Sequence, residues 1–231
     1  NDKDAADVIA AKAKELGSPA YKVIQAGAKV LGNNKDGIDF SLEDDYYGDT
    51  RFHIPFIAWY QVMNASLALT TMEVLKDRIP VTMEQLQAGI ANTRWQGRME
   101  TILPGVIVDG AHNEDGVRRF VETAERFQKE YPLTLLFSAV NDKDYQDMIH
   151  TICSRIKFRK VVTTEVGGYR EVPSAELAEI FCKEGCKDVG NSDNIEEAFH
   201  MAHEAKGEDG MLFCVGSLYL VGEIKTLLLK K

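Results

Sequence analysis

From about residue 100 to its end, the chain alternates short apolar runs with longer amphipathic segments. The runs are rich in Val, Leu, Ile and Phe, which is typical of strands buried on both faces of a sheet. These predicted strands cover residues 106–109, 133–137, 161–163 and 211–215. The intervening segments have helical apolar spacing and predict helices over residues 113–129, 144–156, 174–183, 193–205 and 217–229. Repeated alternation of strand and helix predicts a mostly parallel sheet with helices on both faces.

One further strand precedes this series. Pro104-Gly105 is a turn signal that can direct residues 98–102 back against residues 106–109. The resulting plan is α/β and Rossmann-like. No Gly-x-Gly-x-x-Gly segment follows any of these strands, which argues against a nicotinamide or flavin dinucleotide site.

The first ninety residues follow a different pattern. They open with a predicted helix over residues 4–16, whose inward-facing side chains would be Ala5, Val8, Ile9 and Ala13. A small antiparallel group of strands is predicted at residues 21–24, 38–42 and 52–56. Helical spacing then predicts a long helix over residues 58–76. Thr82, with Gln85 three residues later, is the expected start of another helix.

The polar segment Asn92-Thr93-Arg94 lies where the second pattern replaces the first. Short polar segments of this kind commonly connect separate folding units. We therefore expect two units, residues 1–91 and residues 92–231, with a hinge between them.

Composition restricts the class of protein. A hydrophobic content of 45% in 231 residues is ample for a buried core, whereas a formal charge of −9 argues against a nucleic-acid partner. No run of about 18 apolar residues is present for a membrane span, and the polar amino terminus lacks a signal-peptide core. We expect a cytoplasmic protein without a membrane partner.

The cysteine pattern is consistent with this setting. The four cysteines are too few and too scattered for a disulfide scaffold, and we expect reduced, partly buried thiols. Cys182 and Cys186 lie four residues apart, but no second thiol pair supports a zinc site.

Candidate chemistry gathers at one strand-to-helix turn. The strand at residues 106–109 ends in Asp109, His112 follows in the turn, and Arg98 lies on the preceding segment. Ligands bind beyond the carboxyl ends of parallel strands, and the amides at the start of the next helix attract anions. Asp109 could accept hydrogen bonds from sugar hydroxyls, and the planar fork of Arg98 could hold phosphate oxygens. The same residue types also occur as helix caps and in ordinary turns.

A family resemblance rests on these residues. Trp-Gln-Gly-Arg-Met-Glu at 95–100, followed by Asp-Gly-Ala-His-Asn at 109–113, resembles the paired signature of the folylpolyglutamate synthase and dihydrofolate synthase family, within the Mur ligase superfamily. Gln96 stands where that family usually has proline, and the arginine is kept. The resemblance implies that residues 92–231 are the Rossmann-like carboxy-terminal domain and residues 1–91 the end of the central ATPase domain.

Other segments extend the resemblance along the chain. The run from Gln61 to Asn64 and Ala65 is similar to a family segment whose asparagine belongs to the nucleotide site, although Tyr60 replaces its usual histidine. Two more matches are Asn-Asp-Lys-Asp at 141–144 and Gly-Ser-Leu-Tyr-Leu-Val-Gly-Glu at 216–223. The serine and aspartates of these two segments are first explained as helix caps, with Lys143 a candidate phosphate contact.

The resemblance implies an ADP-forming amide ligase of folate biosynthesis and one-carbon metabolism. ATP would phosphorylate a carboxylate of dihydropteroate or folate, and L-glutamate would attack the acyl phosphate. Asn64 would contact the base, Asp109 the ribose or a water network, and Arg98 the phosphates or the adenine face. His112 would be a catalytic-site contact, and the protein would act as a monomer.

The chain has no Gly-x-x-x-x-Gly-Lys-Ser/Thr phosphate loop. We therefore expect the carboxy-terminal portion of such a ligase, inactive alone, with the ligands for magnesium in preceding sequence and none in this chain. Two alternatives stay open: another Mur-superfamily amino-acid ligase, or a non-catalytic Rossmann-like interaction module.

Overall fold

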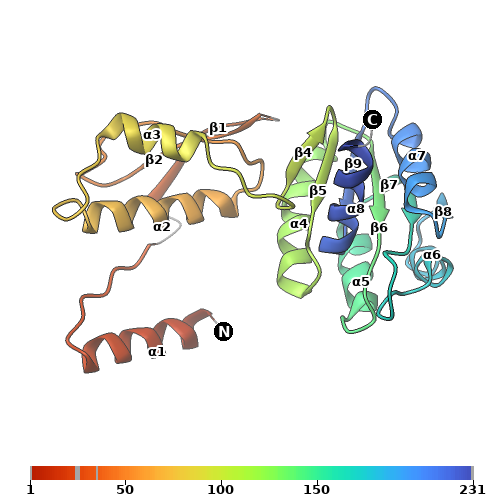
Figure 1. Ribbon diagram of the computed structural model, residues 1–231, viewed down its shortest axis with the longest axis horizontal. Coiled ribbons are helices and arrows are strands. Elements are labelled where there is room, and N and C mark those ends of the chain that lie inside the picture. The colour runs from red at the N-terminus through yellow and green to blue at the C-terminus, as the bar shows by residue number, and fades with distance from the viewer. Residues whose placement is uncertain (1, 24–26, 35, 230–231) are drawn as a thin grey trace.

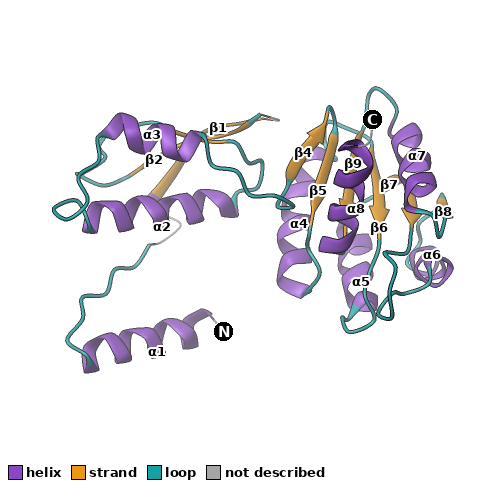
Figure 2. Ribbon diagram, in the orientation of Figure 1, coloured by secondary structure: helices purple, strands orange, loops and turns teal. Residues whose placement is uncertain are grey.

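The computed structural model describes residues 2–23, 27–34 and 36–229, and it contains two sheets, each with its own helices (Figures 1 and 2). The smaller sheet is antiparallel, with the order β1-β2-β3. Its strands are β1 (Ala28–Asn34), β2 (Gly37–Leu42) and β3 (Phe52–Ile54). Two helices pack against it, α2 (Tyr60–Val74) and α3 (Met83–Ala91).

Apolar side chains of the small sheet and its helices form a core of their own. Ile38, Phe40 and Leu42 alternate along β2 and are buried, as expected for a strand with one covered face. Val62 and Leu69 of α2 pack into the same cluster. The expected start of α3 is confirmed, because the Thr82 hydroxyl accepts from the Gln85 backbone and the Gln85 side chain accepts from the Thr82 backbone.

The larger sheet has six strands in the order β4-β5-β9-β6-β7-β8. All its neighbours are parallel except β4, which runs antiparallel to β5. The strands are β4 (Glu100–Leu103), β5 (Val106–Asp109), β6 (Leu133–Phe137), β7 (Phe158–Thr163), β8 (Val189–Asn191) and β9 (Met211–Val215). The predicted α/β plan with a mostly parallel sheet is confirmed.

Helices cover both faces of this sheet. One face carries α4 (Glu114–Phe127), α5 (Tyr145–Arg155) and α6 (Ser174–Lys183), whose apolar residues form one cluster with alternate strand residues. The opposite face carries α7 (Ile195–Lys206) and α8 (Leu218–Leu229), which pack on the remaining strand residues. In the described part of the chain, no helix has the length and apolar character that crossing a bilayer would need.

Two strands differ from the sequence expectation. Residues 21–23 are not in a strand, and Ile24 lies outside the described residues; the third strand of the small sheet is β1 instead. β1 carries Lys, Gly and two Asn, so pairing with β2 rather than apolar content makes it a strand. β8 was not predicted because it is only three residues long and pairs on one side with β7.

The first helix, α1 (Asp2–Glu15), forms as expected, but its expected burial is wrong. Val8 is 69% exposed and Ile9 67% exposed, and Ala5 is also exposed. In Figure 1, α1 lies apart from both sheets, so these side chains meet no covering surface within the described chain. Helical spacing can specify a helix, but only a packed neighbour can bury its apolar face.

We expect Phe213→Ala to lower the free energy of unfolding by about 3–5 kcal/mol, because truncating a buried phenylalanine leaves a cavity. Phe213 in β9 is fully buried, and its ring lies 5.5 Å edge-on from Phe120 and 6.2 Å from Phe127. Urea unfolding followed by circular dichroism measures the change. Leu229→Ala is the control, because Leu229 is 87% exposed and its loss should cost less than about 0.5 kcal/mol. Equal effects of the two substitutions would contradict the described core.

Candidate functional site

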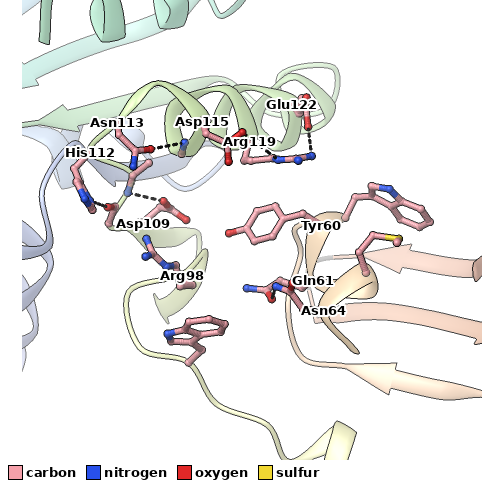
Figure 3. A pocket seen from close by; sticks show the side chains of 16 residues that line it. Tyr60, Gln61, Asn64, Arg98, Asp109, His112, Asn113, Asp115, Arg119 and Glu122 are labelled. Carbon is pink, nitrogen blue, oxygen red and sulfur yellow. Dashed lines mark hydrogen bonds and ion pairs between the residues drawn. The ribbon is translucent and has the colours of Figure 1, made fainter. Parts of the chain in front are cut away.

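A cleft of about 720 Å³ lies between the small-sheet unit and the carboxyl edge of the large sheet (Figure 3). One wall is the amino-terminal part of α2, and the other is the β5–α4 turn with the first turns of α4. Its lining residues are Trp59, Tyr60, Gln61, Met63, Asn64, Trp95, Arg98, Asp109, Gly110, Ala111, His112, Asn113, Asp115, Gly116, Arg119 and Glu122.

Asp109 anchors the sheet side of the cleft. It is the last residue of β5, and only 4% of it is exposed. Its Oδ2 accepts the backbone N–H of Met99 at 2.8 Å, and its Oδ1 accepts that of Ala111 at 2.8 Å. One carboxylate therefore ties the residue 97–99 turn to the loop that follows β5.

Burial raises the pKa of Asp109 to about 6, against an ordinary value of 3.8. Desolvation is the dominant cause, and the two backbone N–H donors, the Arg98 guanidinium and His112 oppose it. The pKa of Tyr60 is also raised, first by burial and then by the negative charge of Asp109. Figure 3 shows the Tyr60 hydroxyl directed across the cleft toward Asp109 and Arg98.

A strained turn places Arg98 between these groups. Gly97 has φ 68°, and Met99, with φ 45°, is the one non-glycine residue of positive φ among those described. The Gly97 N–H donates to Glu100 Oε2 at 2.7 Å, and Lys225 of α8 donates to both oxygens of the same carboxylate, at 2.7 and 2.9 Å. The turn that carries Arg98 is therefore fixed from both sides.

The β5–α4 turn requires small residues. The Gly110 N–H donates to the Gly97 carbonyl oxygen at 2.8 Å, and a Cβ on Gly110 would lie 2.2 Å from Leu218 Cδ2. Only glycine allows this close approach of the turn to α8 without displacing Leu218.

His112 is oriented by the backbone. Its Nδ1 lies 2.7 Å from the carbonyl oxygen of Gly110, which can only accept, so Nδ1 carries a proton. Nε2 of the half-buried ring takes no part in this contact. Nε2 can accept a proton when the ring is neutral and donate one when the ring is charged. Asn113 caps α4 by accepting the Gly116 N–H at 2.8 Å, which leaves other amides at the helix start for a ligand.

The α2 side contributes amides. Asn64 Nδ2 donates to Gln61 Oε1 at 2.8 Å. Gln61 is 4% exposed, and its Nε2 is a buried donor without a hydrogen-bond partner in the structure. An unsatisfied buried donor in the wall of a cleft costs stability unless a ligand or water accepts from it.

The structure brings four of the predicted site residues, Asn64, Arg98, Asp109 and His112, to this one cleft. Lys143 lies in a neighbouring pocket of about 250 Å³, which shares only Asn113 with the cleft. Its phosphate contact therefore stays a prediction.

Sequence analysis missed two lining groups. Arg119 lies on the cleft side of α4, where it pairs with Glu122 at 3.7 Å and approaches Asp115 at 4.0 Å. Trp59 precedes α2. The sequence signal for Arg119 was its position in the second helical turn of α4, shortly after the β5–α4 loop. A helical arginine with acidic neighbours, however, usually forms an ion pair on the protein surface.

The donor set suits a ligand that carries both hydroxyls and anionic oxygens. Arg98, Arg119 and the amides of α4 offer donors to anions, and the Asp109 carboxylate can accept from a hydroxyl. Among the residues described, no group of three or more His, Cys, Asp or Glu side chains is placed to hold a metal ion.

Comparison with known proteins assigns the chain to a family. Residues 97–218, which include the Arg98 turn, β5 and the start of α8, match the model of the Mur ligase glutamate ligase domain. The chain belongs to this family.

Relatives share more than the matched domain. The dihydrofolate synthase/folylpolyglutamate synthase of Bacillus subtilis is 30% identical over 194 residues, which cover 80% of this chain and 43% of the relative. A folylpolyglutamate synthase structure from Thermotoga maritima superposes with a TM-score of 0.77 at 25% identity, over 97% of this chain and 52% of the other. A Mycobacterium tuberculosis folylpolyglutamate synthase structure, complexed with ADP and AMPPCP, gives a TM-score of 0.75 at 22% identity, over 96% of this chain and 52% of the other, and supports the fold. The chain spans about half the length of these proteins.

The raised pKa of Asp109 predicts a pH dependence of stability. The folded chain holds this proton more tightly than the unfolded chain, so ionisation destabilises the fold as pH rises from about 4 to about 6, by up to about 3 kcal/mol. Asp109→Asn should remove this fall, because it has no proton to lose. Urea unfolding at about pH 4, 5, 6 and 7 measures the difference between the two proteins.

Asp115→Asn is the control, because Asp115 is an exposed carboxylate in the first turn of α4. It should keep the wild-type pH dependence. An identical pH profile for wild type and Asp109→Asn would contradict the environment described for Asp109.

Proposed function

We propose that this chain is the carboxy-terminal part of an ATP-dependent, ADP-forming amide ligase that adds L-glutamate to folate or dihydropteroate through an acyl phosphate. The observation that carries the proposal is the convergence of Arg98, Asp109 and His112 with the α2 amides in one cleft, in a chain of the Mur ligase family. In this proposal, residues 1–91 are the end of the central ATPase domain and residues 92–231 the carboxy-terminal domain.

The relatives support the substrate class. The Bacillus subtilis relative is a dihydrofolate synthase/folylpolyglutamate synthase, and the Mycobacterium tuberculosis structure was solved with ADP and AMPPCP. The chain spans about half of such proteins, so the proposed activity belongs to a longer chain. We expect the 231-residue chain alone to have no turnover.

Each cleft residue has a proposed part in binding ATP. Arg98 binds phosphate oxygens or the adenine face, and Asp109 accepts from a ribose hydroxyl or an ordered water. The amides of Gln61 and Asn64 offer donors to the base, and the unpartnered Gln61 Nε2 fits this role. His112 contacts the reacting groups through Nε2.

The placement of the cleft suits acyl phosphate chemistry. An acyl phosphate must be kept from water while the amine of L-glutamate is aligned with it. Walls from two separate units can close on the ligand and exclude water during this step. Lys143, at the same sheet edge, is a proposed phosphate contact.

The cleft carboxylates do not fit a magnesium site. Both oxygens of Asp109 already accept backbone N–H groups, Asp115 pairs with Arg118, and Glu122 pairs with Arg119. We therefore propose that residues outside this sequence hold the magnesium ion.

The test uses the chain extended to the length of its relatives. With ATP, L-glutamate and dihydropteroate or a reduced folate, we expect ADP release that depends on both substrates. ADP release with a peptidoglycan precursor and an amino acid, and not with folates, would assign the chain to another Mur-type ligase. No ADP release with either class, together with no ATP binding by calorimetry, would indicate a non-catalytic module.

Arg98→Ala in that extended chain should weaken nucleotide use by about 1.5–3 kcal/mol, or roughly 10- to 150-fold, the range of a charge-assisted hydrogen bond. The measurements are the KM for ATP, kcat and the Kd for ADP. The matched control is Arg94→Ala, because Arg94 lies four residues earlier and donates to the carbonyl oxygens of Ala91 and Thr93. Unchanged KM, kcat and Kd in Arg98→Ala would reject the role of Arg98.

A further inference from the structure

Two thiols meet on the helical layer away from the cleft. Cys153 lies near the carboxyl end of α5, and Cys186 follows α6, yet their Sγ atoms are 3.6 Å apart. Both side chains are partly buried, so small solutes can reach them. The other two cysteines differ: Cys182 is exposed and Cys214 is fully buried in β9.

The end of α6 turns Cys186 toward α5. Gly185 has φ 93°, its N–H donates to the Cys182 carbonyl oxygen at 3.0 Å, and the Cys186 N–H donates to the Phe181 carbonyl oxygen at 3.1 Å. This is the hydrogen-bond pattern of a glycine-terminated helix. It separates Cys186 from the exposed Cys182, although the two are only four residues apart.

The two sulfur atoms are electrostatically unequal. The pKa of Cys186 lies below its ordinary value because of its hydrogen bond with Cys153, which outweighs burial and the charge of Glu184. The pKa of Cys153 lies far above its ordinary value because of the same hydrogen bond and because of burial. Cys186 is therefore the better nucleophile, and Cys153 keeps its proton until the partner sulfur has reacted.

The surroundings favour sulfur chemistry over metal binding. The charge of Glu184 acts on both thiols, but its Oε2 pairs with His150 Nδ1 at 3.0 Å. The described residues, this cluster included, contain no set of three His, Cys, Asp or Glu side chains placed to hold a metal ion. Two adjacent thiols without further ligands are the arrangement of a dithiol that can be oxidised.

We propose that Cys153 and Cys186 form a reversible disulfide when the protein meets hydrogen peroxide. The Cys186 thiolate attacks one peroxide oxygen, the O–O bond breaks, and Cys186 becomes a sulfenic acid while the leaving oxygen departs as water after protonation. Cys153 then attacks the Cys186 sulfur, the S–O bond breaks, and the Cys153 proton leaves with the hydroxide as a second water. The two thiols lose two electrons to the peroxide, and a dithiol reductant reverses the reaction.

The required movement is small. The sulfur atoms need to close from 3.6 Å to about 2.05 Å, and each cysteine sits at or beyond a helix end where the backbone can adjust. The disulfide would join α5 to the segment between α6 and β8. Neither cysteine lines the cleft, and no residue of α5 or α6 does.

Tryptic mapping tests the proposal on the unmodified 231-residue chain. Trypsin cleaves after Lys143, Arg155, Lys183 and Lys187, so Cys153, Cys182 and Cys186 fall in three separate peptides. The chain is treated with a few equivalents of hydrogen peroxide, quenched with catalase and alkylated with iodoacetamide. We expect a linked species that joins peptide 144–155 to peptide 184–187 and that disappears after treatment with dithiothreitol.

Three variants sharpen the test. Cys182→Ser should leave the linked species unchanged, whereas Cys186→Ser should abolish it, because peptide 184–187 then carries no thiol. Cys153→Ser should instead accumulate a sulfenic acid on Cys186, trapped by dimedone. The proposal is overturned if peroxide oxidises Cys182 in the unmodified chain while Cys153 and Cys186 stay reduced and are recovered as alkylated thiols. This result does not depend on the folding of any variant.

Discussion

The buried carboxylate of Asp109 holds together the parts of the chain that form the cleft. Its two oxygens accept one N–H from the turn before β4 and one from the turn after β5. The link supports the positive φ of Met99 together with the hydrogen bonds of Gly97 to Glu100 and Gly110. Burying the ionisable Asp109 carboxyl group costs stability, as its raised pKa shows. In exchange, the carboxyl group makes the rim of the cleft rigid for a ligand.

A second constraint is that the cleft has walls from two units of the chain. The α2 wall supplies an aromatic hydroxyl and side-chain amides, and the β5–α4 wall supplies cations, a carboxylate and helix amides. The two walls therefore offer complementary chemistry to opposite sides of a ligand. A nucleotide, with a base at one end and phosphates at the other, suits such a division, in agreement with the proposed ligase function.

The cleft and the cysteine pair lie at different places around the large sheet. The cleft lies at the carboxyl edge of β5, whereas the Cys153–Cys186 pair lies between the ends of α5 and α6 on one helical layer. A covalent link at the second place would change how two helices are held without touching the first.

The sequence by itself determined the parallel strands other than β8, their helices and the Arg98, Asp109 and His112 group. These features are local: a buried β-branched run, a turn of small residues and a helix start lie within a few residues of one another, so their geometry follows from the chain between them. Only the tertiary structure decided that β1 becomes a strand and that α1 leaves Val8 and Ile9 exposed. It also decided that Tyr60 lines one cleft with Asp109, and that Cys153 meets Cys186. Each of these depends on contact between segments far apart in the chain, and residue periodicity does not record which surfaces will meet.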